Sequence, residues 1–179
     1  VAGVVDDAGD VAAAAVAGVM SLADAARLVV HRGALMQAQP RGAMLQVRLS
    51  ADAVLRDLAA AGYAQALTLA AQNAPQACVL AGADAAIDAM MEHWQQTGVA
   101  CRRLQTSHAF HSPDMEGACS PFEAHVRSVA LHEPVIPIVS TCTGTWLTSE
   151  EARSPGYWVQ QSRQPVRFSQ ALSIARGAL

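Results

Sequence analysis

The spacing of apolar residues changes along the chain and predicts a small sheet-containing lobe between two helical segments. Residues 11–19 are almost all apolar and rich in alanine, which is typical of a helix buried on most of its faces. A second helix is predicted to begin after Ser21 and to end near Met36, because Ser21 and Asp24 have the spacing of an N-terminal cap and the third helical position. Residues 39–42, Gln-Pro-Arg-Gly, interrupt this helical pattern.

From residue 43 the apolar period becomes two, and residues 43–49 alternate between two faces as a half-buried strand does. The pattern then predicts a helix, two strands, a second helix and a last strand, at residues 51–61, 66–71, 77–81, 84–96 and 100–105. The order βαββαβ is that of the split βαβ, ferredoxin-like fold. We therefore predict a small lobe at residues 43–106, inserted between residues 1–42 and 107–179 of a larger lobe.

The rest of the larger lobe is predicted to mix helices with one strand. A helix-like stretch covers about residues 113–130, and short helices are expected at residues 157–161 and 168–175. Residues 134–139, Pro-Val-Ile-Pro-Ile-Val, are rich in β-branched side chains and predict a strand.

Composition narrows the class of protein. The net charge of −3 provides no basic footprint for nucleic acid or an anionic membrane. All 12 basic residues are arginine, so chemistry that needs a Schiff-base lysine or a phosphate-loop lysine is excluded. Only 15% of the residues are charged, against about 25% in typical domains, which suggests that part of the surface is covered by a partner.

The cysteines and the apolar stretches indicate the cellular compartment in which the protein is expected. The 4 cysteines contain no Cys-x-x-Cys pair, which is typical of a reduced, cytoplasmic chain. Residues 1–9 contain no basic segment of the kind that opens a signal peptide. The longest apolar stretch, residues 11–20, is too short to cross a bilayer. We expect a cytoplasmic protein that does not bind membranes.

Two features could carry chemistry. His108-Ala-Phe-His111 follows the last predicted strand of the small lobe, where a histidine can act as a general base between two lobes, although ordinary loop histidines are also common. Arg32 lies near the end of the second helix and could bind a carboxylate in a bidentate manner, or could simply complement the helix dipole. Cys101 and Cys119 flank the two histidines with spacings that match no zinc pattern, so we expect no metal.

Several motifs together resemble the acyltransferase domains of modular type I polyketide synthases, which are relatives of malonyl-CoA:acyl-carrier-protein transacylases. The most telling are residues 17–25 (Ala-Gly-Val-Met-Ser-Leu-Ala-Asp-Ala), 107–115 (Ser-His-Ala-Phe-His-Ser-Pro-Asp-Met) and 164–168 (Gln-Pro-Val-Arg-Phe). The resemblance implies an α/β fold: part of an α/β-hydrolase-like large subdomain with an inserted ferredoxin-like small subdomain. This agrees with the βαββαβ order.

The resemblance also implies roles for individual residues. His111 occupies the position of the catalytic histidine in a Ser/His dyad, and Arg32 that of the arginine that pairs with the free carboxylate of the extender unit. The His-Ala-Phe-His motif accompanies malonyl selection in this family, with His108 and Phe110 at the substrate and Phe110 disfavouring an α-methyl group. The family substrate is malonyl-CoA, and no resident cofactor is implied. The implied partners are neighbouring synthase domains and an acyl carrier protein bearing phosphopantetheine.

One departure concerns the nucleophile. The family places it in a Gly-His-Ser-x-Gly-Glu turn just before the alanine-rich helix, and the ungapped register puts that turn on residues 5–10. Gly9 matches and Asp10 replaces the glutamate, but Asp7 stands at the position of the serine. The Gly-Gln-Gly loop that the family uses for its oxyanion hole is also absent from this sequence.

Three interpretations follow. The first is a truncated, catalytically inactive acyltransferase domain retained as a structural or docking element, with His111 a vestigial general base. The second is a segment of an active acyltransferase whose N-terminal half is supplied elsewhere. The third is an unrelated ferredoxin-like module that binds a small ligand.

Overall fold

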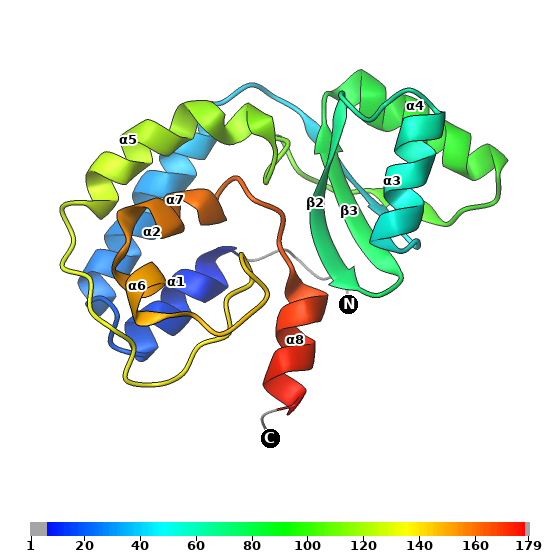
Figure 1. Cartoon of the computed structure of the whole chain (residues 1–179). Coiled ribbons are helices and arrows are strands. Elements are labelled where there is room, and N and C mark those ends of the chain that lie inside the picture. The colour runs from blue at the N-terminus through cyan, green and yellow to red at the C-terminus, as the bar shows by residue number, and fades with distance from the viewer. Residues whose placement is uncertain (1–6, 178–179) are drawn as a thin grey trace.

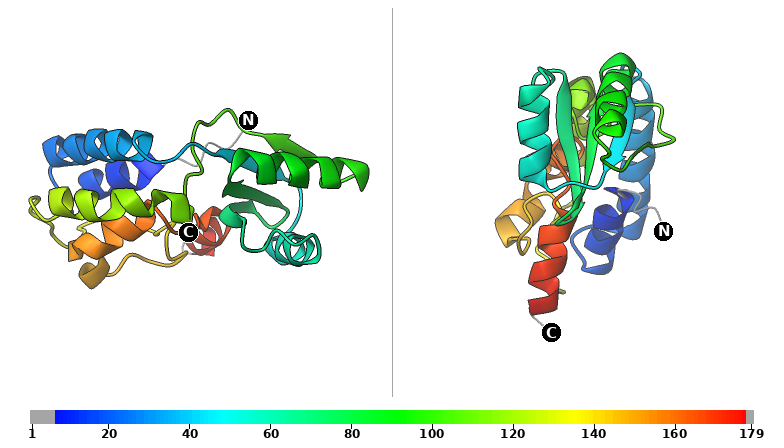
Figure 2. Two further views of the ribbon diagram at one scale, coloured as in Figure 1. Left: turned by 90° about the horizontal axis from the view of Figure 1, so that it is seen from above. Right: turned by 90° about the vertical axis from the view of Figure 1, so that its right-hand side faces the viewer.

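The protein consists of a helical lobe and a sheet-containing lobe that lie side by side (Figures 1 and 2). The structure is a computed structural model that describes residues 7–177, with side chains described from Gly9 onward. The helical lobe contains α1 (Asp7–Val16), α2 (Leu22–Gln37), η1 (Pro113–Met115), α5 (Glu116–Val126), α6 (Ser149–Arg153) and α7 (Pro155–Gln161). The last helix, α8 (Phe168–Gly177), contacts the sheet and projects away from both lobes.

The small lobe has the ferredoxin-like topology that the sequence predicts. Its elements are β1 (Ala43–Val47), α3 (Ala51–Ala60), β2 (Leu67–Ala74), β3 (Ala77–Gly82), α4 (Asp84–Gln96) and β4 (Cys101–Arg103). The strand order is β2-β3-β1-β4, and every neighbouring pair is antiparallel. This order follows when two βαβ crossovers interleave in one sheet.

Alternate residues of β1 face opposite sides of the sheet, and different segments pack against each side. Leu45 and Val47 face α3 and α4, in a core whose largest member is the fully buried Trp94. Met44 faces the opposite side, where it packs with Ala109 and Val166 from segments that follow the small lobe. The sheet is therefore buried on both faces, and its second face supports the segment that contains His108 and His111.

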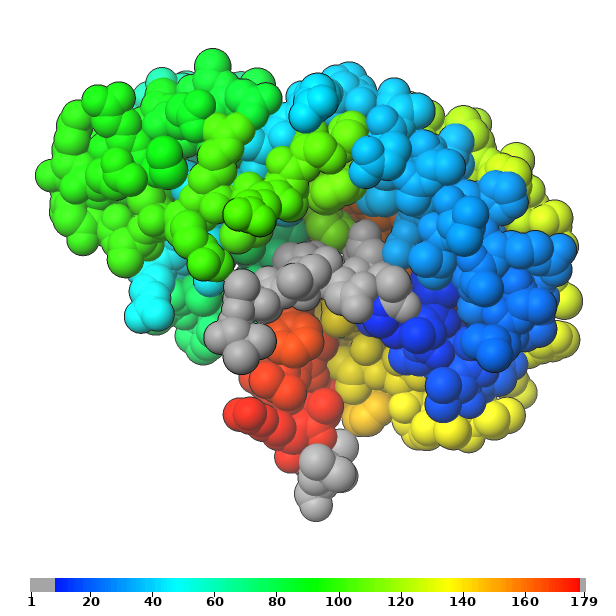
Figure 3. Space-filling model, turned by 180° about the vertical axis from the view of Figure 1, so that it is seen from behind, coloured from blue at the N-terminus to red at the C-terminus, as the bar shows by residue number. Residues whose placement is uncertain are grey.

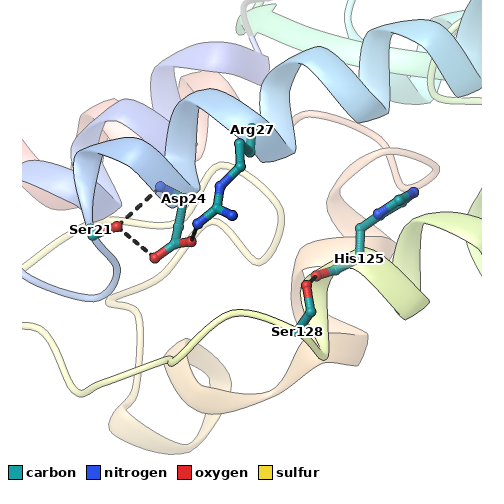
Figure 4. Close-up of polar contacts among 5 residues, drawn as sticks. All are labelled: Ser21, Asp24, Arg27, His125 and Ser128. Atoms are coloured by element: carbon teal, nitrogen blue, oxygen red, sulfur yellow. Dashed lines mark hydrogen bonds and ion pairs between the residues drawn. The ribbon is translucent and has the colours of Figure 1, made fainter.

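Local sequence signals place the helix ends correctly. The Ser21 hydroxyl accepts a hydrogen bond from the backbone N–H of Asp24 (3.0 Å), and the Asp24 carboxylate pairs with Arg27, as Figure 4 shows. Ser50 caps α3 in the same way, accepting from the N–H of Ala53 (3.3 Å). Such caps satisfy N–H groups that a helix leaves without an internal partner.

The helical lobe has its own apolar core, in which α1, α2, α5 and α7 meet. Tyr157 and Trp158 of α7 lie in this core, with their rings in an edge-to-face arrangement. The Tyr157 hydroxyl donates to Ser140 Oγ (2.7 Å), and burial raises the pKa of Tyr157 above its ordinary value. Seen from behind, α1 and α2 lie on the opposite side of the molecule from the small lobe (Figure 3). No helix in the described part of the chain is long and apolar enough to cross a membrane.

The predicted strand at residues 134–139 is wrong. Its only ladder contact among the described residues is an isolated bridge between Val139 and Trp146. The Val135 backbone N–H instead donates to the carbonyl of Ala17 (2.8 Å), and the Val135 side chain is 80% exposed. β-Branched residues form a strand only where a neighbouring strand satisfies their backbone groups, and none of the described strands lies beside this segment.

Smaller differences concern element ends. The strand predicted at residues 66–71 extends through the expected turn to Ala74, because two irregularities in its register keep it paired with β3. The long helix expected after residue 113 begins as a 3₁₀ turn and ends at Val126. The pattern missed α6, whose 5 residues are too few to show a helical period although Thr148 and Glu151 form a capping box.

Gly42 allows the segment containing His108 to approach the sheet. A Cβ at this position would lie 2.9 Å from Ala109 Cβ and 2.9 Å from the Gly82 carbonyl oxygen. We predict that Gly42→Ala lowers the free energy of unfolding by about 1–3 kcal/mol, because backbone cannot yield as a flexible side chain does. Gly33 lies inside α2 with open space around its Cα, so Gly33→Ala should raise the free energy of unfolding by about 0.5–1 kcal/mol. Urea denaturation of both variants checks this pair, and equal effects would contradict it.

Candidate active site

Residues 107–112 form a tightly fixed turn between β4 and η1. The Gly42 N–H donates to the Ser107 carbonyl (3.2 Å), and a backbone bridge joins Arg41 to His108. The Ser112 hydroxyl closes the turn by donating to the carbonyl of Ala109 (2.6 Å). Both histidines of the His-Ala-Phe-His motif are buried as a result.

His111 is held in an uncommon backbone conformation. Its φ of 56° makes it the one non-glycine residue with positive φ in the described part of the chain, and it is only 1% exposed. The left-handed region costs a non-glycine residue about 1–3 kcal/mol, so the surrounding contacts must over-determine it. Such outliers are frequent where a side chain has to point in a defined direction.

The His111 ring is oriented by a backbone carbonyl. Its Nδ1 lies 2.9 Å from the carbonyl oxygen of Gln164, which can only accept a hydrogen bond, so Nδ1 carries the proton. In the neutral ring, Nε2 then has the lone pair. A general base needs one ring nitrogen fixed by a structural acceptor, and Nδ1 of His111 meets this requirement.

His108 and Phe110 lie beside His111 in the same turn. Their ring centroids are 5.9 Å apart, and the Ser107 hydroxyl lies 2.7 Å from His108 Nδ1. Phe110 is half-buried and packs against the second face of the sheet. The turn therefore presents an aromatic side chain next to the candidate base.

Arg32, the arginine that the resemblance places at the substrate carboxylate, is buried. It lies on α2, which packs against α5, and is 5% exposed. Its Nη1 is buried and makes no hydrogen bond to any described residue. A buried guanidinium nitrogen without a hydrogen-bond partner is unfavourable, so this position is suited to an anionic ligand. That Arg32 and His111 line one cleft remains a prediction.

Asp7 begins α1, but its side chain lies outside the described residues. Its position relative to His111 thus remains a prediction from the sequence. Burial raises the pKa of the Cys101 and Cys119 thiols, which disfavours the thiolate that a nucleophilic cysteine needs. Within residues 7–177, no three His, Cys, Asp or Glu side chains gather as a metal site.

Sequence reasoning missed the role of the Gln164 carbonyl. Every residue has a backbone carbonyl, so no pattern of side-chain types could reveal that this one orients His111. The Gln-Pro-Val-Arg-Phe motif at residues 164–168 marked the segment without indicating which atom matters.

The ferredoxin-like lobe contains an oriented histidine and the helical lobe a buried arginine, and comparison with known proteins shows to which family this arrangement belongs. Residues 6–178 match the family described as acyl transferase domain. The chain is 43% identical over 161 residues to the spectinabilin polyketide synthase system protein NorB of Streptomyces orinoci, covering 89% of this chain and 7% of that protein.

Solved structures show the same relationship. The acyltransferase domain from the second module of the salinomycin polyketide synthase is 40% identical, with a TM-score of 0.86 over 94% of this chain and 39% of that chain. The acyl transferase domain of SpnD, in complex with 2-(pent-4-yn-1-yl)malonyl, is 35% identical, with a TM-score of 0.88 over 94% of this chain and 40% of that chain. This chain belongs to the acyltransferase domains of type I polyketide synthases, and it spans well under half of these solved relatives.

The buried Nη1 of Arg32, which has no described hydrogen-bond partner, leads to a prediction about stability. We expect Arg32→Met to raise the free energy of unfolding of the ligand-free protein by about 1–3 kcal/mol, because it replaces a buried charge that is incompletely hydrogen-bonded by the described residues with an apolar side chain of similar length. Arg27→Met on the same helix, where the arginine is exposed and paired with Asp24, should change it by less than about 0.5 kcal/mol. Chemical denaturation measures both, and destabilisation by Arg32→Met would show that the guanidinium has a compensating partner.

Proposed function

We propose that this chain forms the carboxylate-binding part of a malonyl-type acyl site in which covalent catalysis has been lost. The observation that carries the proposal is the buried Arg32, whose Nη1 has no described partner. A malonyl group ends in a free carboxylate, and a guanidinium binds a carboxylate through two parallel hydrogen bonds. The SpnD domain, solved with a malonyl derivative, is similar over nearly the whole of this chain.

The aromatic side chain of the turn supports selection of malonyl over α-branched units. Phe110 is half-buried between the sheet and His108, so its ring has little room to move aside. An α-methyl group would have to displace that ring or leave it strained. Malonyl, with no substituent on the α-carbon, avoids this conflict.

Loss of covalent catalysis follows from Asp7. A histidine with a proton on Nδ1 activates a hydroxyl by removing its proton, but a carboxylate at neutral pH has no proton to remove. Attack by the carboxylate itself would give a mixed anhydride that water hydrolyses. His111 would then be a vestigial base, and the chain would contribute structure or docking rather than acyl transfer.

A docking role is supported by the exposed apolar side chains of the helical lobe. Residues 135–136 run beside the end of α1, where Val16 and Val135 are each at least 75% exposed. Similar sequences occur within much longer synthase proteins, and this chain corresponds to 7% of the Streptomyces orinoci protein. The proposed partners are therefore neighbouring synthase domains and an acyl carrier protein.

A second candidate is a segment of an active malonyl-CoA:acyl-carrier-protein acyltransferase whose remaining part is supplied separately. The coverage of the solved domains favours it, since this chain corresponds to 39–40% of them. The two candidates differ in whether acyl transfer appears when the remaining part of such a domain is added.

Binding of malonate tests the carboxylate site. We predict weak binding of malonate to the 179-residue chain, reduced about 10- to 100-fold by Arg32→Ala because the charge-assisted pair is lost. Arg27→Ala, on the same helix but exposed, is the matched control and should leave affinity unchanged. Calorimetry or ligand-observed NMR measures the affinities. Equal effects of the two substitutions would contradict the proposal.

Labelling tests the loss of catalysis. Incubation with radiolabelled malonyl-CoA should leave no hydroxylamine-sensitive label on the protein. Asp7→Ser alone should not restore transfer to a carrier protein, because it supplies a hydroxyl but not the oxyanion donors, which act together with the nucleophile. Stoichiometric labelling of the wild-type chain would favour the second candidate, and mapping the label would identify the nucleophile.

A further inference from the structure

The segment from Gln161 to Arg167 connects α7 with the edge of the sheet and contacts His111 on the way. Val166 pairs with the edge of β2, donating to the carbonyl of Ala70 (2.9 Å) and accepting from the N–H of Gln72 (2.9 Å). The Arg167 N–H donates to the carbonyl of Thr141 (2.7 Å). Between these contacts and α7 lies Gln164, whose carbonyl orients His111.

Asp10 holds the other end of this segment. One carboxylate oxygen, Oδ2, accepts hydrogen bonds from Thr141 Oγ1 and from Gln161 Nε2, both at 2.5 Å. The carboxylate of α1 therefore ties together the loop that contains Thr141 and the last residue of α7. Charge-assisted hydrogen bonds of this kind are stronger than those between neutral groups.

The orientation of the Gln161 amide is set by its hydrogen bond to Asp10. Gln161 is 3% exposed, and its Oε1 is buried with no described hydrogen-bond partner. A carboxylate can only accept, so Asp10 requires the amide to present Nε2 and leaves Oε1 unsatisfied. The hydrogen bond to Asp10 therefore orients the Gln161 amide, although Oε1 then has no described partner.

We propose that Asp10 is a positioning residue that fixes the orientation of His111 through Gln161 and the Gln164 carbonyl. The path is short and stiff, because the Gln164 N–H donates to the carbonyl of Gln160 (2.8 Å) and so continues the end of α7. His111 has a positive φ that depends on its surroundings, which makes its ring sensitive to a shift of its acceptor. The inference rests on the proposed function only in regarding His111 as the base.

A donor–acceptor exchange tests the proposal. Asp10→Ala removes both hydrogen bonds, and Gln161→Glu places two carboxylates against each other. The double variant Asp10→Asn/Gln161→Glu restores the pair with the donor on α1. Histidine ¹⁵N spectra of the full chain report which nitrogen of His111 carries the proton, with the signal assigned by its loss in His111→Asn.

We expect the Nδ1–H form of His111 in the wild type, its loss or mixing in each single variant, and its recovery in the double variant. Asp57→Asn is the matched control, since Asp57 also accepts a side-chain N–H, from Trp94 (2.9 Å), but lies in the small lobe. It should leave the His111 signal unchanged even if it lowers the melting temperature.

Unchanged His111 shifts in a folded Asp10→Ala variant would overturn the proposal. A double variant that loses the Nδ1–H form of His111 as Gln161→Glu alone does would also overturn the proposal. This result remains decisive if the single variants fail to fold, because the proposal requires the double variant to recover the Nδ1–H form. A wild-type spectrum without the Nδ1–H form would overturn it as well. Failure of malonate to bind would count against the proposed function and leave this result untouched.

Discussion

The hydrogen bond from His111 to the carbonyl of Gln164 joins parts of the chain that are 53 residues apart, and the rest of the site depends on it. It requires the turn at residues 107–112 to lie close to the sheet, which the absence of a side chain at Gly42 permits. It also requires the segment after α7 to cross from the helical lobe to β2, where Val166 is paired. This hydrogen bond between a side chain and the backbone therefore depends on how both lobes are assembled.

Three features of the described residues are locally unfavourable. His111 has positive φ, and neither Nη1 of the buried Arg32 nor Oε1 of Gln161 has a hydrogen-bond partner among the described residues. None of these would improve the stability of an ordinary core, and cores generally satisfy their buried polar groups. Such features are expected where a fold keeps a functional geometry at the expense of local stability.

The secondary structure of the small lobe could be predicted because its signals are local. Ser50 caps α3 where expected, and the alternation in β1 separates Leu45 from Met44 onto opposite faces. The predicted strand at residues 134–139 is wrong because strand formation depends on residues that are distant in the sequence. A strand depends on a neighbour that supplies backbone partners, and composition alone does not reveal whether that neighbour is present.

The sequence by itself determined the ferredoxin-like lobe and most of the order of helices and strands, and it singled out Arg32, His108, Phe110 and His111 as candidate site residues, because side-chain type, spacing and family motifs carry that information. Only the tertiary structure decided which nitrogen of His111 holds the proton and that Arg32 is buried with no described hydrogen-bond partner for Nη1. The first depends on a backbone carbonyl, which every residue possesses. The second depends on the packing of α2 against α5, and long-range packing leaves no local mark on the sequence.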